Sequence, residues 1–325
     1  MNAYFMIVLL GVILFYVVWG LGWLLERLSH VFLNVTRNPG SRAWYLLVGP
    51  GVALHESSHA LGCVFTRTKI VEFKPVNITV EDDQIILGYV KYINPKSAIK
   101  RAVINLAPVA VSLILLVFVA LGALYLVPEE FRTGVGGAAL DLLSRLIDMK
   151  NIPTTPILDP LWQIASFVYT FFYDFAGLTV INPLFWIVSF LAMTIMFSNA
   201  PSKVDIMNAS KGLQYIMLFN IIWLILAAFF PQIGFITFGL YELLAVLFAL
   251  AIGFAAIAYG FFLMITAMGN LKTPYNLLPL ISMILTGVLL YLFPIGTPQL
   301  HTIIAISVFT IIALLLLASK QLRTE

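Results

Sequence analysis

Long uncharged runs of apolar residues constrain this chain more than any other feature. Residues 4–25, for example, contain no Asp, Glu, Lys or Arg. The hydrocarbon core of a bilayer is about 30 Å thick, and a helix that rises about 1.5 Å per residue crosses it in about 20 apolar residues. We therefore expect an all-α multi-pass membrane protein with about eight transmembrane helices. The expected spans are residues 4–25, 43–65, 102–127, 183–199, 212–231, 240–268, 276–293 and 300–318.

The composition supports this class and excludes others. Of the 325 residues, 61% are hydrophobic and only 10% are charged, whereas a soluble domain carries about 25% charged residues. The net charge of +3 is too small to indicate a nucleic-acid partner, so the expected surroundings are a lipid bilayer. The single cysteine, Cys63, cannot form an internal disulfide. The composition does not indicate an oligomeric state.

Three connections between the expected spans have patterns of their own. Residues 66–98 form the most polar connection, and polar and apolar residues alternate within it. This alternation predicts short strands and a small β-hairpin-like segment. Residues 128–160 are rich in Gly and Pro around an amphipathic stretch at 140–147. Residues 161–181 are apolar, but Asp174 interrupts them, and we interpret them as a hairpin that does not cross the membrane.

The second expected span contains the sequence His55-Glu56-Ser57-Ser58-His59. On a helix, this His-Glu-x-x-His spacing puts both imidazoles on one face, where they can bind one zinc ion, with the glutamate placed to take a proton from water. Ionisable residues inside a membrane are costly and mark functional sites by default. We therefore predict His55 and His59 as zinc ligands and Glu56 as the catalytic base.

A catalytic zinc site needs a third protein ligand, and Asp205 is the leading candidate. It lies between two apolar stretches, in the segment Asn199-Ala200-Pro201-Ser202-Lys203-Val204-Asp205. Glu242 and Asp174 are the competing carboxylates. Cys63 shares the face of His59, but three residues spaced at i, i+4 and i+8 span about 12 Å of helix. His30 and His301 lie near expected membrane ends, where interfacial histidines are more common than ligands.

These residues resemble the site-2 protease family of intramembrane zinc metalloproteases. That family has His-Glu-x-x-His on one membrane helix, here His55 to His59, and an aspartate third ligand on a later helix, here Asp205. The segment Asn105-Leu106-Ala107-Pro108 resembles a small-residue and proline element of the family. Ile206 and Val111 stand where the family pattern has glycine and asparagine.

The resemblance also suggests how the chain is divided. It covers residues 43–231, a metalloprotease-like core with an inserted segment at 128–181. Residues 1–42 form the first span and its connection, and residues 232–325 form C-terminal transmembrane helices outside the resemblance.

The distribution of basic residues predicts the orientation. Seven Lys and Arg residues lie in residues 66–101, against three in 26–42 and three in 128–160, so the loop at 66–101 is expected to be cytoplasmic. The metal would then lie about 10 Å below the cytoplasmic surface. Asp205 reaches the same side if residues 161–181 do not cross. With eight spans, both termini are then cytoplasmic, in a protein of the cell membrane.

The expected function is zinc-dependent hydrolysis of peptide bonds in membrane-spanning or membrane-associated protein substrates. The strand-like residues 69–93 could offer an edge to an extended substrate, although the sequence identifies no substrate-binding residue. Two alternatives remain open. One is a membrane zinc peptidase of another type, with a glutamate such as Glu242 as third ligand. The other is a non-enzymatic transporter or scaffold, which absence of bound zinc would favour.

Overall fold

The computed structural model describes residues 3–34, 42–77, 79–81, 84–86, 88–125, 135–149, 158–200, 202–293 and 295–323. Most of this chain is helical, as the apolar runs predict. The helices are α1 (Ala3–Asn34), α2 (Arg42–Phe65), α3 (Ala98–Tyr125), α4 (Val135–Met149), α5 (Asp159–Ala176), α6 (Pro183–Ser198), α7 (Lys203–Phe229), α8 (Pro231–Gly269), α9 (Leu278–Leu292) and α10 (Pro298–Ala318). Short 3-10 turns cover Tyr275–Leu277 and Lys320–Leu322.

The polar connection after α2 forms short strands, as its alternation predicts. These are β1 (Ile70–Lys74), β2 (Thr79–Glu81), β3 (Gln84–Ile86) and β4 (Tyr89–Tyr92). β1 pairs antiparallel with β4, and β2 pairs antiparallel with β3. Gly88 lies between β3 and β4, and its backbone packs so closely on Pro75 that a Cβ could not fit.

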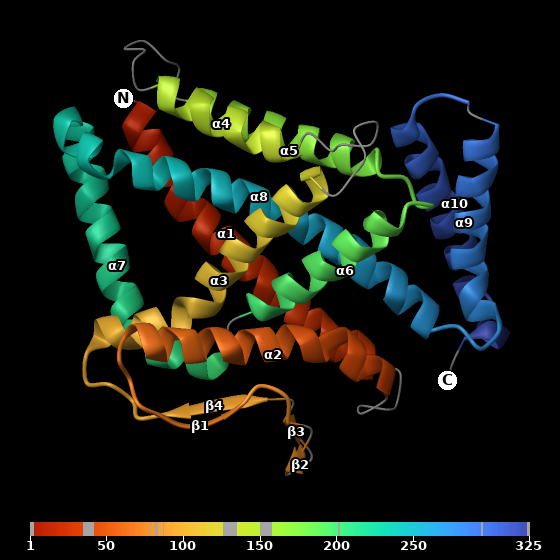
Figure 1. Cartoon of the computed structure of the whole chain (residues 1–325), viewed down its shortest axis with the longest axis horizontal. Helices are drawn as coiled ribbons and strands as arrows, with labels where there is room; N and C mark the ends of the chain where they lie inside the picture. Colours follow the sequence, from red (N-terminus) through yellow and green to blue (C-terminus); the bar gives the residue numbers. More distant parts are fainter. Residues whose placement is uncertain are drawn as a thin grey trace.

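The helices form a bundle with one helical layer across each end (Figure 1). α1, α3, α6 and α8 cross in the middle, and their buried residues form the main core, which includes Ile7, Leu116, Met193 and Phe254. α7 flanks one side, and α9 and α10 flank the other. α2 runs across one end next to β1 and β4, whereas α4 and α5 lie across the opposite end.

Six helices of the described chain are long and apolar enough to cross a membrane, so the expected count of eight was wrong. The six segments are Met6–Leu25, Ala98–Gly122, Lys203–Leu226, Gly239–Gly269, Tyr275–Leu292 and Pro298–Ala318. The other two expected spans do form helices. α2, however, carries the polar His-Glu-Ser-Ser-His motif at its centre, and α6 has only 16 residues, which is about 24 Å of helix.

Residues 161–181 form most of one amphipathic helix, α5, rather than a hairpin. Its buried residues recur every three or four positions, at Pro160, Ile164, Phe167 and Phe171, which is the spacing of a helix with one buried face. α5 is not among the six candidate spans. The amphipathic stretch at 140–147 lies in α4, with Leu142 and Leu146 buried. Both helices cover the end of the bundle opposite α2 (Figure 1).

Two glycines bring α2 into backbone contact with its neighbours. A Cβ at Gly51 would lie 2.7 Å from the Cβ of Phe197 in α6, and a Cβ at Gly62 would lie 2.9 Å from the Cα of Ile104 in α3. Only glycine permits such approach. The two contacts lie on either side of the motif, so they hold its histidines close to the backbones of α6 and α3.

Candidate metal centre

α2 and α7 bring together the two histidines and the aspartate that the sequence singles out. His55 Nε2 lies 3.3 Å from Asp205 Oδ2, and His59 Nε2 lies 3.1 Å from Asp205 Oδ1. The two histidine Nε2 atoms are 3.0 Å apart. The spacing of four residues on α2 supplies the histidine pair, and the first turn of α7 supplies the carboxylate. These three residues could hold a metal ion.

The backbone of α3 orients His59. Its Nδ1–H donates a hydrogen bond to the carbonyl oxygen of Ile104 at 2.9 Å. In an uninterrupted helix that oxygen would accept from the N–H four residues later. The residue at that place is Pro108, which lies inside α3 and has no N–H. The proline therefore leaves the Ile104 carbonyl free for the imidazole.

The C-terminal end of α6 orients His55 in the same way. Its Nδ1–H donates to the carbonyl oxygen of Ser198 at 2.8 Å. Ser198 is the last residue of α6, and the last four carbonyls of a helix have no partner within it. Each imidazole is thus oriented by a carbonyl oxygen, one in α3 and one in α6, that accepts no hydrogen bond within its own helix.

These hydrogen bonds determine which nitrogen faces the centre of the site. A carbonyl oxygen only accepts, so each Nδ1 carries the proton and each neutral ring directs an Nε2 lone pair at Asp205. Lone pairs of His55, His59 and the carboxylate then converge, and a metal ion at this point could accept all three. Tetrahedral zinc with bonds of about 2.0 Å places neighbouring ligand atoms about 3.3 Å apart, close to the spacings here, so the residues fit a zinc ion.

Asp205 is held by the start of its own helix. Its Oδ2 accepts from the backbone N–H of Ser202 at 2.9 Å, and its backbone N–H donates to the Ser202 hydroxyl at 3.1 Å. This reciprocal pair is a capping box, which satisfies two N–H groups at the beginning of α7. Pro201, which precedes the cap in the sequence, lies outside the described residues. The cap aims the carboxylate at the histidines.

A cavity of about 520 Å³ opens onto the metal centre. Glu56 lies in its wall next to both histidines, and the backbone of Val90 in β4 faces the Glu56 carboxylate. Tyr92, Asn105 and Asn208 supply further polar side chains. The site therefore combines a cation-binding group, a carboxylate outside that group and space for water and a substrate.

The outer face of the β1–β4 pair carries a separate charge network. Glu72 accepts hydrogen bonds from the Tyr89 hydroxyl at 2.6 Å and from Lys91 at 3.1 Å, and it pairs with Lys74 at 3.0 Å. These partners, Tyr89 first, hold the pKa of Glu72 at about 2, below its ordinary range. Glu72 is therefore ionised at neutral pH, and the network joins both strands beside the cavity.

The competing ligand candidates lie outside the metal-binding group of the described chain. That group contains neither Glu242 nor Asp174, and neither Cys63 nor His301. Glu242 is buried within α8, and Cys63 is buried one turn beyond His59. The side chain of His30 lies outside the described residues.

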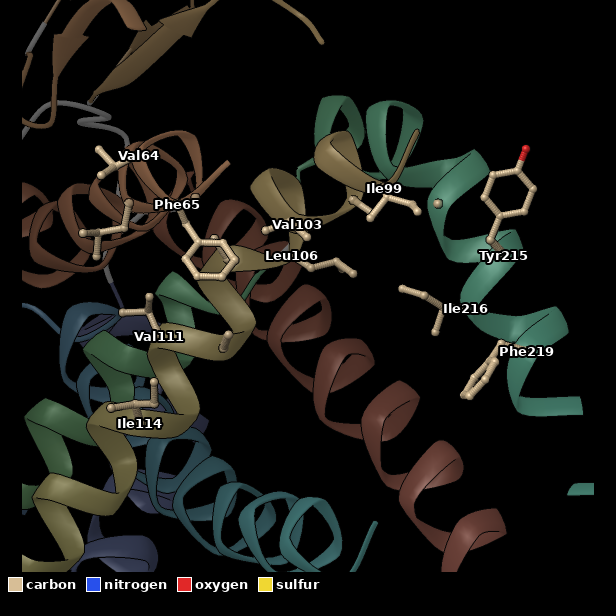
Figure 2. A pocket seen from close by; sticks show the side chains of 16 residues that line it. Val64, Phe65, Ile99, Val103, Leu106, Val111, Ile114, Tyr215, Ile216 and Phe219 are labelled. Carbon is tan, nitrogen blue, oxygen red and sulfur yellow. The ribbon is translucent and has the colours of Figure 1, made fainter. Parts of the chain in front are cut away.

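A second, larger cavity lies beside the metal centre. It has a volume of about 910 Å³ and an almost wholly apolar lining from α2, α3 and α7 (Figure 2). Phe65, Leu106 and Ile216 line it from these three helices. Each helix reaches the metal cavity within about one turn, at His59, Asn105 and Asn208. The two cavities are therefore neighbours along all three helices.

Sequence reasoning missed the carbonyl oxygens of Ile104 and Ser198, as well as Tyr92. One signal for Ile104 was available: Pro108 four residues later removes the N–H that would otherwise occupy its carbonyl. Backbone acceptors such as Ser198 have no residue-type signature. Tyr92 could be found only from the folding of β4 over α2.

We predict that Asp205→Ala and His55→Ala each weaken zinc binding at least about 100-fold, because each removes a donor atom and not merely its support. Chelator competition on purified protein measures the affinity. Glu242→Gln, which alters another buried carboxylate, should bind zinc like the wild type. Normal zinc affinity in Asp205→Ala would exclude Asp205 as a ligand.

We also predict that Pro108→Ala weakens zinc binding by about 10- to 100-fold while leaving α3 intact. The new N–H would compete with His59 for the Ile104 carbonyl, and the helix gains an ordinary hydrogen bond. Zinc affinity and the thermal midpoint should therefore change in opposite directions. Pro298→Ala is the control, since Pro298 begins α10 and removes no intrahelical bond. Unchanged affinity in Pro108→Ala would contradict the orienting role of the Ile104 carbonyl.

Comparison with known proteins gives no match to a family model, to a curated protein or to a solved structure.

Proposed function

We propose that this protein is a zinc metallopeptidase that hydrolyses peptide bonds of membrane-embedded or membrane-associated proteins. One observation is the main support for the proposal. His55, His59 and Asp205 direct lone pairs at one point within 3.0–3.3 Å of one another, beside a glutamate that takes no part in the group. The resemblance of the motif residues to the site-2 protease family agrees with this activity.

Glu56 has the position of a general base. It follows His55 directly on α2, so its side chain leaves the helix away from the metal-binding face and enters the wall of the cavity. There it can accept a proton from the attacking water and later pass it to the leaving amine. A zinc ion bound by the three ligands would polarise the scissile carbonyl and lower the pKa of water.

The polar cavity supports a supply of water to the reaction. It lies at the end of the bundle that carries α2 and the strands, and its walls include Asn105, Asn208 and Glu56. Water is the scarce reactant within a membrane. A site near a bundle end, with polar walls, needs only a short path from the aqueous phase.

β4 supports a mode of substrate binding. It pairs with β1 along one edge only, and Val90 in its middle faces Glu56. An extended peptide added to a strand edge forms backbone hydrogen bonds regardless of its side chains. We propose that β4 holds the unwound substrate segment next to Glu56, because a helical segment keeps its peptide groups in its own hydrogen bonds.

The apolar cavity supports a membrane-embedded substrate. Its lining includes exposed apolar side chains, such as Val64, Phe65 and Ile114 (Figure 2), which suit hydrocarbon surroundings. Because α2, α3 and α7 each line both cavities, an apolar segment entering between these helices has only a short distance to the metal centre.

We further propose that the end carrying α2 and the strands faces the cytoplasm of a cell membrane. Basic residues concentrate there, whereas Arg145 in α4 lies at the opposite end. Seven basic residues lie between the end of α2 and the first turn of α3, in the segment that carries the strands: Arg67, Lys69, Lys74, Lys91, Lys96, Lys100 and Arg101.

This topology revises the expectation that both termini are cytoplasmic. The start of α1 and the end of α10 lie at opposite ends of the molecule (Figure 1). The earlier expectation assumed that residues 43–65 cross the membrane. Since α2 runs across one end instead, that crossing is lost. We propose that the short apolar helix α6 crosses together with the six candidate spans, which makes seven crossings and places the N-terminus on the non-cytoplasmic side.

Glu56→Gln should retain bound zinc and lose cleavage of a transmembrane model substrate by at least about 100-fold, because only the proton acceptor is removed. Cleavage is followed by gel and mass spectrometry in detergent or liposomes, with zinc measured on the same sample. Asp141→Asn, a carboxylate change in α4 at the opposite end of the bundle, is the control. Wild-type cleavage by Glu56→Gln would refute the mechanism, and wild-type protein without zinc would favour a non-enzymatic transporter or scaffold.

For the topology, a reporter fused after Leu322 should be cytoplasmic, and one fused before α1 should lie on the opposite side. Paired reporters that are active in opposite compartments measure this directly. Two reporters on the same side would contradict the proposed crossing number.

A further inference from the structure

The cavity at the metal centre contains a hydrogen-bond donor that the roles above leave unassigned, the hydroxyl of Tyr92. Side chains alternate along a strand, so Tyr89 and Lys91 share one face of β4 and Tyr92 lies on the other. Tyr89 and Lys91 both donate to Glu72 on the outer face. Tyr89, Lys91 and Tyr92 all line the metal cavity, but Tyr92 is not part of the Glu72 network and hydrogen-bonds Asn105 of α3.

α3 holds Tyr92 and His59 in a fixed relation. The Tyr92 hydroxyl donates to Oδ1 of Asn105 at 3.4 Å, and Asn105 Nδ2 donates to the carbonyl oxygen of Arg101 at 2.7 Å. The second bond determines the orientation of the amide, so Oδ1 is the atom that faces the tyrosine. Ile104, the neighbouring residue, accepts from His59. One turn of α3 therefore positions both the ligand and the hydroxyl.

The Tyr92 hydroxyl is suited to donate to a stronger acceptor. Burial raises its pKa above the ordinary value, so it carries its proton at neutral pH. Its bond to Asn105 is long for an O–H donor, and Asn208 is its other neighbouring amide. A negatively charged oxygen in the cavity would accept this proton in a shorter, charge-assisted hydrogen bond.

We propose that Tyr92 is a catalytic residue that stabilises the oxyanion of the tetrahedral intermediate in peptide hydrolysis. The inference rests on the proposed function. When water adds to the scissile carbonyl carbon, a C–O bond forms, the π electrons move to the carbonyl oxygen and Glu56 takes the water proton. The oxyanion electrons then re-form the C=O bond as the C–N bond breaks, the C–N electron pair goes to nitrogen, and Glu56 returns the proton to the amine. Tyr92 keeps its proton and hydrogen-bonds the oxyanion while the tetrahedral intermediate exists.

Position on β4 connects this role to substrate binding. The backbone of Val90 hydrogen-bonds the Glu56 carboxylate, and Tyr92 lies two residues further along β4, about 6.6 Å away. A peptide bound along β4 would therefore pass both Glu56, the proton acceptor, and the Tyr92 hydroxyl, the oxyanion donor.

Tyr92→Phe tests the role, because it removes only the hydroxyl. We expect kcat for a transmembrane model substrate to fall about 100-fold, as for loss of one oxyanion donor, with zinc content and KM unchanged. A peptide phosphonamidate, which carries a tetrahedral anionic centre, should lose affinity for this variant in parallel with kcat.

Tyr241→Phe is the matched control. Tyr241 also donates to an asparagine, Asn220 Oδ1, at 2.7 Å, but in the contact between α8 and α7 away from the metal cavity. Its loss should leave kcat and phosphonamidate binding unchanged.

The outcomes separate the two proposals. If the wild type cleaves and Tyr92→Phe keeps its kcat and its phosphonamidate affinity, the role of Tyr92 is refuted and the proposed function stands. If Tyr92→Phe loses zinc or changes KM alone, Tyr92 supports the site and does not act on the oxyanion. If the wild type cleaves no substrate, the proposed function fails, and this inference fails with it.

Discussion

A histidine in an apolar interior must find an acceptor for its Nδ1 proton, and the structure around this centre depends on how that requirement is met. Backbone carbonyls inside helices normally accept from the residue four positions later, so few are free. Here the proline in α3 frees one and the end of α6 supplies the other. Both imidazoles consequently present their Nε2 atoms to Asp205, and a cation-binding group results from two local defects in helical hydrogen bonding.

These bonds require the three helices to approach closely. Gly51 and Gly62 bring α2 against α6 and α3 on either side of the motif, so the backbone contacts and the histidine bonds reinforce each other. The capping box of α7 then aims Asp205 independently. The ligand set is thus built from helix packing, a proline and a helix cap, without contribution from the C-terminal helices α9 and α10.

The sequence predicted much of this arrangement, and its failures have physical reasons. Periodicity and length predicted the helices and short strands. Motif spacing selected His55 and His59, the position between two apolar stretches selected Asp205, and the three residues do lie together. The number of spans was overestimated because residues 43–65 are apolar on average, although the centre of α2 is polar. Side-chain alternation could not place Tyr92, since its role depends on which face of β4 packs over α2. The Ser198 carbonyl depends on where α6 ends, which residue types alone do not specify.

The helix cap on Asp205 has a consequence for how the protein matures. The hydrogen bonds between Ser202 and Asp205 fix the carboxylate at the start of α7. The hydrogen bonds from the imidazoles to the carbonyl oxygens fix the two rings, and neither set involves an ion. The donor atoms are therefore preorganised, and little conformational entropy is lost when an ion enters. In the proposed metallopeptidase, the chain could therefore insert into the membrane and pack its helices before a metal ion enters from the aqueous side.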